Sequence, residues 1–223
     1  FTYVLRDMTH AEGRFYSAED ADSEGVEGKF YVWTPSEVRR VLGNDTGELV
    51  CDYYDITAGG NFEGNSIPNL LNQSAEEIAD AQGISVEVWQ RQLKEAREKL
   101  FQHRDQRVHP HKDDKILTAW NGLMIAALAK GAKVLGIAKY REAAEKAVRF
   151  LFKHLRREDG RLLARYRDGE ASYPGYLDDY AFFIWGLHEL YEATWETDYL
   201  RQAIRLNEEL LELFWDEDRG GCY

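Results

Sequence analysis

Two pairs of adjacent aspartates are the residues whose types and spacing most directly suggest chemistry. Asp113–Asp114 and Asp178–Asp179 each precede a mainly apolar stretch that contains a tryptophan. One aspartate is enough to cap a helix and complement its dipole, which stabilises the helix by about 1 kcal/mol. A second carboxylate at the same place is available for general acid or base catalysis. We therefore take Asp114, Asp178 and Asp179 as candidate catalytic residues, with helix capping as the structural alternative.

The segment 19–25 is also acidic, with Asp20, Asp22 and Glu24 followed by Gly25. Oxygen-bearing side chains at positions 1, 3 and 5 and a glycine at position 6 imitate the start of an EF-hand calcium loop. Tyr31 stands at position 12, where such a loop needs a bidentate acid, so we predict no metal site. The segment is either a solvated turn or the rim of a pocket, in which Asp20 and Asp22 are further candidate catalytic residues.

Aromatic and amide side chains lie close to these acids in the sequence. An aromatic ring offers an apolar surface to the C–H face of a sugar, while hydroxyl and amide groups bind its polar edges. The candidate ligand-binding residues of this kind are Trp33, Trp120, Asn121, Tyr176 and Tyr180. Aromatic residues at helical spacing usually belong to the core, which is the alternative for Trp120 and Trp185. Asn61 and Glu63, in a glycine-rich loop, are further candidates for the pocket rim.

The histidines and cysteines indicate neither a metal site nor a bound cofactor. His109 and His111 flank a proline in a predicted loop, where inert side chains are the expectation. His188 falls within an apolar helix, so we expect a hydrogen-bonded core histidine, with proton transfer as the alternative. Cys51 and Cys222 form no CxxC pair and no disulfide framework, which is typical of a reducing compartment. We expect a cytoplasmic location, and a buried, unreactive Cys51.

The charge balance disfavours two classes of partner. Lys and Arg number 28 against 40 Asp and Glu, so the formal net charge is -12. Such a surface repels nucleic-acid phosphates and anionic lipids. No apolar run approaches the ~18 residues that a membrane span needs. We therefore expect no nucleic-acid partner and no membrane association. The start at Phe1 without a leader, and the end at Tyr223, lead us to expect a fragment of a longer protein.

Turn and capping signals predict the elements of the first hundred residues. Strand-like runs at 14–16 and 29–33, on either side of the acidic segment, predict a β-hairpin with a long tip. Thr34, Pro35 and Glu37 form a capping box with proline at the first helical position, which predicts a helix to about Gly43. Further helices are predicted over 47–55, after Ser74, and from Ser85 to about residue 101.

Pairs of helices repeat in the second half of the chain. Asp113–Asp114 with Trp120 recurs 65 residues later as Asp178–Asp179 with Trp185. The predicted helices 115–135 and 180–193 are apolar on nearly every side, whereas their partners have one apolar stripe. The stripes consist of Tyr140, Ala144, Val148, Leu151 and Leu155, and of Leu200, Ile204, Leu211 and Phe214.

Alternation of buried and striped helices predicts two concentric layers. We therefore predict an all-α fold of the α/α-toroid type, forming part of a barrel, with a short β-hairpin at the N-terminal end. A plain helical solenoid is the alternative. We treat residues 1–223 as a single domain, with the hairpin and acidic loop at 1–33 and helical hairpins over 34–223.

Connection lengths indicate where a ligand would bind. The turns at 136–138 and 196–198 are short, whereas the return from 157 to 177 spans some twenty residues and contains the turn signals Asp159–Gly160 and Asp168–Gly169. Long connections of this kind are usually functional. This one lies where the inner helices begin, so helix N-termini and candidate aspartates are predicted to face one pocket.

Four motifs in the chain resemble a known family. They read GRFYSAEDADSEG at 13–25, EGKFYVW at 27–33, DDKILTAWNG at 113–122 and GYLDDYA at 175–181. Together they are similar to the six-hairpin glycosidase-like part of proteins described as thioredoxin-domain-containing or spermatogenesis-associated. The resemblance implies the fold of N-acylglucosamine 2-epimerases and several glycoside hydrolases. It also implies a thioredoxin-like domain upstream, absent from this chain, as a partner in the parent protein.

The resemblance transfers no mechanism, because fold alone does not determine chemistry. Two functions therefore remain open at the level of the sequence. The first is a carbohydrate-active enzyme, glycosidase-like or epimerase-like, whose acids act on a small sugar-like ligand held by tyrosines. The second is a non-catalytic module that binds a glycan or a protein segment and serves the upstream redox domain.

Overall fold

The computed structural model describes residues 1–223 and contains two compact units. Phe1–Ala18 and Lys112–Tyr223 form the first, which we term the repeat unit. Glu19–His111 form the second, which we term the cavity unit. Short strands β1 (Ala18–Glu19) and β4 (Lys112–Asp113) stand where the chain passes from one unit to the other. The grouping of both units into a single domain stays a prediction.

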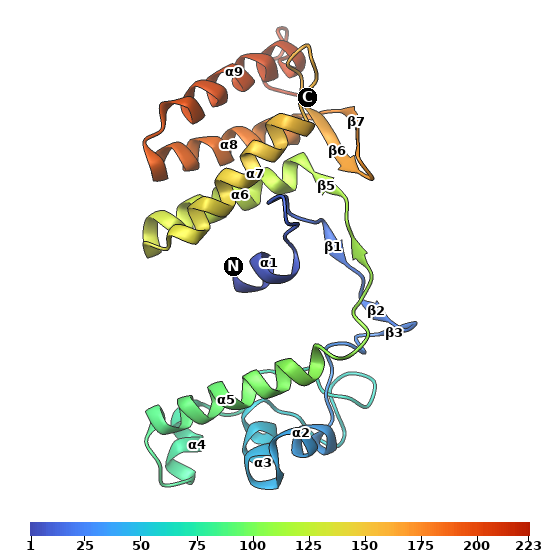
Figure 1. The fold of residues 1–223 in the computed structure, drawn as a ribbon, viewed down its shortest axis with the longest axis vertical. Coiled ribbons are helices and arrows are strands. Elements are labelled where there is room, and N and C mark those ends of the chain that lie inside the picture. The colour runs from blue at the N-terminus through green and yellow to red at the C-terminus, as the bar shows by residue number, and fades with distance from the viewer. The chain divides into compact units, whose positions relative to one another are not determined.

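Two helical hairpins make up most of the repeat unit (Figure 1). The first consists of α6 (Thr118–Leu135) and α7 (Ala138–His154), and the second of α8 (Leu177–Thr194) and α9 (Thr197–Phe214). α6 and α8 pack side by side, and α7 and α9 each pack on the inner helix of their own hairpin. The chain thus has the predicted mainly helical fold, in which α6 and α8 form an inner pair and α7 and α9 are the outer helices.

Smaller elements complete the repeat unit. Helix α1 (Thr2–Asp7) precedes a three-stranded antiparallel sheet of β5 (Ile116–Leu117), β6 (Leu163–Arg167) and β7 (Glu170–Pro174). β6 and β7 occupy the long return between the hairpins and turn at Asp168–Gly169, both with positive φ. This turn signal was visible in the sequence. The return is therefore an ordered β-hairpin at the end where α8 begins.

The structural repeat has a period of 59 residues, not the 65 suggested by the Asp-Asp and Trp motif. α8 begins at Leu177 and α6 at Thr118, and α9 begins at Thr197 and α7 at Ala138. The helix ends correspond too, since Gly136 and Trp195 are both left-handed C-caps. As a result, Asp178–Asp179 lie in the first turn of α8, whereas Asp113–Asp114 are separated from α6 by strand β5.

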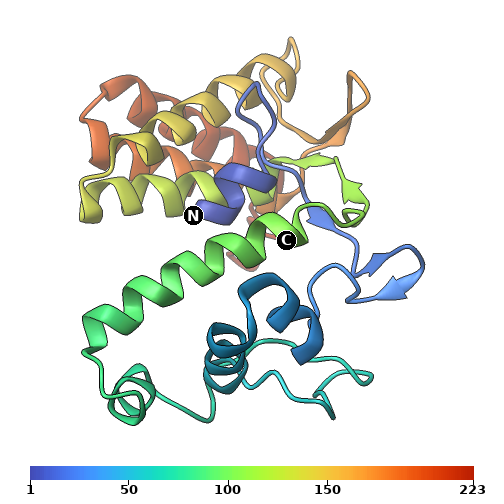
Figure 2. The ribbon, with the colours of Figure 1, turned by 60° about the horizontal axis from the view of Figure 1, so that its bottom comes forward.

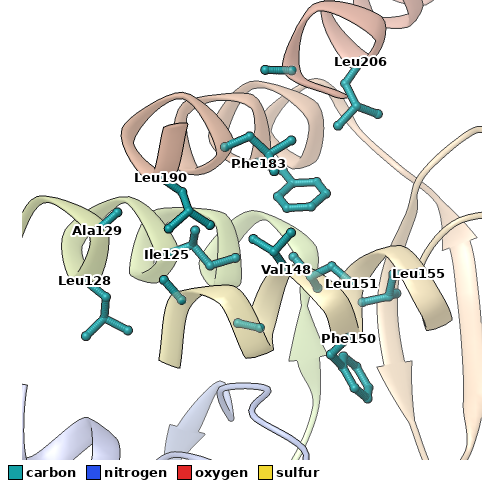
Figure 3. Packing of buried hydrophobic residues seen from close by; sticks show 14 of the residues in the cluster. Ile125, Leu128, Ala129, Val148, Phe150, Leu151, Leu155, Phe183, Leu190 and Leu206 are labelled. Atoms are coloured by element: carbon teal, nitrogen blue, oxygen red, sulfur yellow. The ribbon is translucent and has the colours of Figure 1, made fainter. Parts of the chain in front are cut away.

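The core of the repeat unit lies between its inner and outer helices. Figure 3 shows Ile125 of α6, Val148 and Leu151 of α7, and Phe183 and Leu190 of α8 among the side chains of this cluster. All five are almost completely shielded from solvent. Burial of such side chains stabilises a fold by about 1.5–3 kcal/mol each. The apolar stripe predicted for α7 is confirmed, because all five of its residues are buried.

Glycines allow α6 and α8 to approach each other closely. A Cβ atom on Gly122 would lie 2.6 Å from backbone atoms of Phe182 and Phe183. One on Gly186 would lie 2.7 Å from the carbonyl oxygen of Gly122. Because a backbone atom cannot rotate away as a side chain can, only glycine fits at these two positions.

The stripe predicted for α9 was wrong for two of its four residues, while Leu200 and Phe214 are partly buried. Ala203, Leu206 and Leu210 are its buried residues, whereas Ile204 and Leu211 are exposed. The error arose because large apolar residues lie on both faces of α9, so their presence alone does not distinguish the buried face from the exposed one. Trp185 and His188, predicted as core residues, are also exposed, and they line a groove of about 510 Å³ with Ile204.

The cavity unit contains four helices, and Figure 2 shows the longest, α5 (green), running beside the shorter ones. They are α2 (Pro35–Leu42), α3 (Asn44–Tyr53), α4 (Ala75–Ala81) and α5 (Val86–Arg104). The predicted caps at Thr34, Ser74 and Ser85 are confirmed, since each hydroxyl accepts an N–H bond from its helix. Cys51 is buried as predicted, and desolvation raises the pKa of its thiol to about 11.

The short strand pair near the N-terminus lies inside the acidic segment, not on either side of it. β2 (Asp22–Ser23) pairs with β3 (Val26–Glu27) across Glu24–Gly25, whose φ angles are 53° and 73°. Two positive φ values in a two-residue loop are typical of a type I′ turn, whose twist suits antiparallel strands. The run 29–33 is not a strand, because its N–H groups at Tyr31 and Val32 donate back to the carbonyl oxygen of Gly28 in a turn, and Arg107 binds carbonyl groups of the same run.

No helix in the structure combines the length and the apolar character that a membrane crossing requires. The structure also contains no group of three or more His, Cys, Asp or Glu side chains arranged to hold a metal ion.

Candidate functional site

A cavity of about 600 Å³ lies within the cavity unit, and we term it the Arg107 cavity. Its walls come from the β2–β3 hairpin, the run 29–32, the loop 62–65 and the chain that follows α5. The polar side chains that line it are Ser23, Glu24, Glu27, Lys29, Glu37, Glu63, Asn65, Gln106 and Arg107. The acidic segment thus forms part of a pocket rim, which was one of its two predicted roles.

Two turns of the same kind present glutamates at this rim. Glu24 precedes Gly25 at the tip of the β2–β3 hairpin, and Glu63 precedes Gly64 in a second tight turn closed by a bridge between Phe62 and Asn65. Both glutamates have positive φ, 53° and 48°, which costs about 1–2 kcal/mol for a residue other than glycine. Strained residues often mark functional sites, which supports this rim as a candidate.

Arg107 organises the inner wall of the cavity. Its Nη1 donates hydrogen bonds to the carbonyl oxygens of Phe30 (2.7 Å) and Val32 (2.9 Å). Its Nη2 donates to Oε1 of Glu37 at 2.9 Å, and the guanidinium lies 4.3 Å from the ring centroid of Trp33. Charge-assisted bonds of this kind are the strong ones. Arg107 therefore fixes the run 29–33 and leaves the cavity wall rigid.

The cavity offers both the apolar surface and the hydrogen-bonding groups that a hydroxylated ligand needs. Phe30 and Phe62 supply apolar surface, and the amides of Asn65 and Gln106 can donate and accept hydrogen bonds. The glutamate oxygens accept hydrogen bonds from hydroxyl groups. A mainly apolar lining with a few polar groups is typical of small-molecule sites.

Only some of the candidate residues predicted from the sequence in this unit line the cavity. Glu63 lines it, whereas the exposed Asn61 lies outside the lining and exchanges hydrogen bonds with the backbone of Ile67. Asp20 and Asp22 are exposed outside the lining, and Oδ1 of Asp20 accepts the N–H of Asp22 at 3.1 Å. Trp33 is buried behind Arg107 and does not line the cavity. Catalytic roles for Asp20 and Asp22 stay predictions.

Asp179 joins the first turns of the two inner helices in the repeat unit. Its Oδ1 accepts the N–H of Ala119 in α6, and its Oδ2 accepts the N–H of Tyr176 before α8, both at 2.9 Å. The side chain is buried, and desolvation raises its pKa to about 6 in spite of these two bonds. The geometry is that of a double helix cap, which was the structural alternative for this residue.

The other candidate acids of the repeat unit are exposed. Oδ1 of Asp114 lies 3.0 Å from Nε of Arg167 in an ion pair. Asp178 shares a shallow hollow of about 490 Å³ with Tyr176, so the structure brings these two candidates together. Trp120 is 53% exposed, which removes the alternative of a core residue. The predicted functional roles of these residues are untested by the geometry.

Asn121 and Tyr180 lie in the interior of the repeat unit. The Oδ1 of Asn121 accepts the N–H of Phe15, and its Nδ2 donates to the carbonyl oxygens of Phe15 and Leu117. The Tyr180 hydroxyl accepts the N–H of Leu162 at 2.9 Å. Both side chains are about 1% exposed, so their surroundings favour structural roles over the ligand binding that we predicted.

Replacing Asn121 by alanine is expected to lower the free energy of unfolding by about 2 kcal/mol, because buried backbone groups of Phe15 lose their partners. Urea unfolding of the Asn121→Ala variant measures this loss. Trp120→Ala, at the neighbouring half-exposed position, serves as the control and should cost less than about 1 kcal/mol. Equal losses in both variants would contradict the anchoring role.

Sequence reasoning missed Arg107 and Glu37 as parts of the site. Their partners lie about 70 residues away along the chain, so no local pattern marks them. The two turns of the rim, in contrast, could have been predicted from a local sequence pattern, because the dipeptide Glu-Gly occurs at both, at 24–25 and 63–64. Glycine preceded by a polar residue is typical of a two-residue hairpin turn.

Comparison with known proteins places the whole chain in one group of relatives. No protein-family model matches it. Over 99% of its length, however, the chain aligns at 37% identity with spermatogenesis-associated protein 20 of Homo sapiens. The chain is a relative of spermatogenesis-associated protein 20. It is also 36% identical to spermatogenesis-associated protein 20 of Rattus norvegicus, again over 99% of the chain. The resemblance seen in the four motifs is thereby confirmed.

The aligned region is 32% of the length of human spermatogenesis-associated protein 20, so the chain spans about a third of that relative. Similar solved structures include the cellobiose 2-epimerase of Spirochaeta thermophila, at 18% identity and a TM-score of 0.45, over 49% of this chain and 28% of that one. The cellobiose 2-epimerase of Bacillus thermoamylovorans shows 24% identity and a TM-score of 0.47, over 52% and 30%.

Proposed function

We propose that the chain binds a small, hydroxylated, sugar-like ligand in the Arg107 cavity. The observation that carries the proposal is the composition of the lining, in which phenylalanine rings, amides and carboxylates surround one space of about 600 Å³. A sugar ring has an apolar face and hydroxyl groups that both donate and accept, so it matches such a lining.

The interaction partners of two of the three acids predicted in the repeat unit support the choice of this cavity as the ligand site. Both oxygens of Asp179 are engaged by backbone N–H groups, and Asp114 is paired with Arg167. Asp179 is thus engaged as a helix cap, whereas Asp178 is exposed in a hollow with Tyr176, and its catalytic role stays a prediction.

A panel of monosaccharides and disaccharides, titrated by calorimetry and by protein-observed NMR, tests the proposal. Phe62→Ala and Gln106→Ala are expected to weaken binding at least about tenfold and threefold, because they remove a ring face and a polar contact. Asp22→Asn, on the same hairpin but outside the lining, is the matched control and should bind like the wild type. Binding that none of the cavity variants weakens would overturn the proposal.

Catalysis on the bound ligand is a second candidate function, and the position of Glu63 favours it. This carboxylate is exposed at the rim on a strained turn, with no cation within ion-pair distance. It is therefore free to act as a general base or acid. NMR spectra of the sugars after long incubation would reveal hydrolysis or epimerisation, and Glu63→Gln should abolish either reaction. Unchanged sugars at every condition would eliminate this candidate.

A further inference from the structure

We infer that the ligand of the Arg107 cavity carries an ammonium group beside its hydroxyl groups, as an amino sugar does. The inference rests on the proposed function and names the charge class of the ligand. The evidence is which charged side chains of the cavity form ion pairs with one another and which do not.

Both cations of the cavity are already neutralised. Nζ of Lys29 lies 2.7 Å from Oε2 of Glu24, and Nη2 of Arg107 lies 2.9 Å from Oε1 of Glu37. The other terminal nitrogen of Arg107 is engaged by backbone carbonyl oxygens. A phosphorylated or carboxylated sugar would need at least one of these cations, and would have to displace a glutamate to reach it.

Two acids of the cavity have no such partner. Glu27 and Glu63 are exposed, and neither lies within ion-pair distance of a cation. The lining therefore holds four carboxylates against two cations, which leaves two negative charges uncompensated. An anionic ligand would be repelled by them, whereas an ammonium group would be attracted.

The expected preference is modest because both glutamates are in contact with water. Exposed ion pairs contribute little individually, so two of them together favour the charged ligand by about tenfold. Salt screens this electrostatic contribution, so the preference for the charged ligand should also decrease as the ionic strength rises.

Glucosamine, N-acetylglucosamine, glucose and glucose 6-phosphate, titrated in parallel at pH 6 and low ionic strength, separate the charge classes. We expect glucosamine to bind about tenfold more tightly than the two neutral sugars, and glucose 6-phosphate to bind most weakly. The double variant Glu27→Gln, Glu63→Gln should bring the ratio of glucosamine to glucose affinity close to one, as should 0.5 M NaCl. Asp52→Asn, which removes an exposed acid of α3 outside the lining, should leave the ratio unchanged.

The outcomes distinguish this inference from the proposed function. Equal affinities for glucosamine and glucose in the wild type would overturn the charge preference and leave sugar binding intact. The tightest binding by glucose 6-phosphate would also overturn it. If none of the four sugars binds, the proposed function itself fails. A preference that survives the double variant would show that the ammonium group is bound elsewhere, which again overturns the inference.

Discussion

Replacing Gly122 by alanine is expected to lower the free energy of unfolding by about 3 kcal/mol. The new methyl group would lie 2.6 Å from the backbone of α8, so α6 and α8 would have to separate. Close-packed interiors transmit such a shift and lose contacts along the whole helix pair. The loss exceeds the gain of about 1 kcal/mol that alanine brings through its helix propensity. Urea unfolding followed by circular dichroism measures the net effect.

Gly131→Ala is the matched control on the same helix. A Cβ atom there would meet the ring of Phe1, a side chain that is 41% exposed and can rotate aside. We expect this variant to be close to neutral or slightly stabilising. If Gly122→Ala were as well tolerated as Gly131→Ala, the close approach of α6 and α8 would not be a determinant of stability.

Replacing Asp179 by alanine is expected to cost about 2–4 kcal/mol at pH 4, because two N–H groups in the first turns of α6 and α8 lose their acceptors. Asp178→Ala, at the adjacent exposed position, should cost less than about 1 kcal/mol. Chemical denaturation of both variants gives the comparison. A similar loss in the two variants would contradict the role of Asp179 as a double cap.

The same residue makes the stability of the protein depend on pH. The pKa of Asp179 is about 6 in the folded state, against about 3.9 for an unfolded aspartate. Between these values the unfolded chain releases its proton and the folded chain keeps it, so this contribution is complete below pH 4 and is lost as the pH rises through 6. The loss approaches about 3 kcal/mol. The penalty of Asp179→Ala should therefore shrink from pH 4 to pH 7, and a constant penalty would refute the raised pKa.

Local signals predicted much of the fold. The caps at Thr34, Ser74 and Ser85 could be identified because a capping hydroxyl and its N–H donor lie within three residues of each other. The stripe of α7 was visible because large apolar residues mark its buried face. The buried face of α9 was not identified, because leucine or isoleucine occurs both on that face, at Leu206 and Leu210, and on the exposed face, at Ile204 and Leu211.

The candidate site was harder to predict because its geometry depends on residues distant in sequence. Paired aspartates suggested a repeat of 65 residues, but strand β5 displaces Asp113–Asp114 from the start of α6. Asn121 was predicted to bind a ligand from its neighbours in sequence, and it binds the backbone of Phe15 instead. The type of a polar residue shows which bonds it can form, but only the tertiary structure determines which partner it meets.

The two-residue turns between α6 and α7 and between α8 and α9 have a consequence for the order of folding. Each hairpin joins residues that are near in sequence, so its contact order is low and its loop-closure entropy is small. The bond from Asp179 to Ala119 closes a span of 60 residues and requires both hairpins to be in place. We therefore expect the hairpins to form early and independently, and their docking through this carboxylate to come late in the folding pathway.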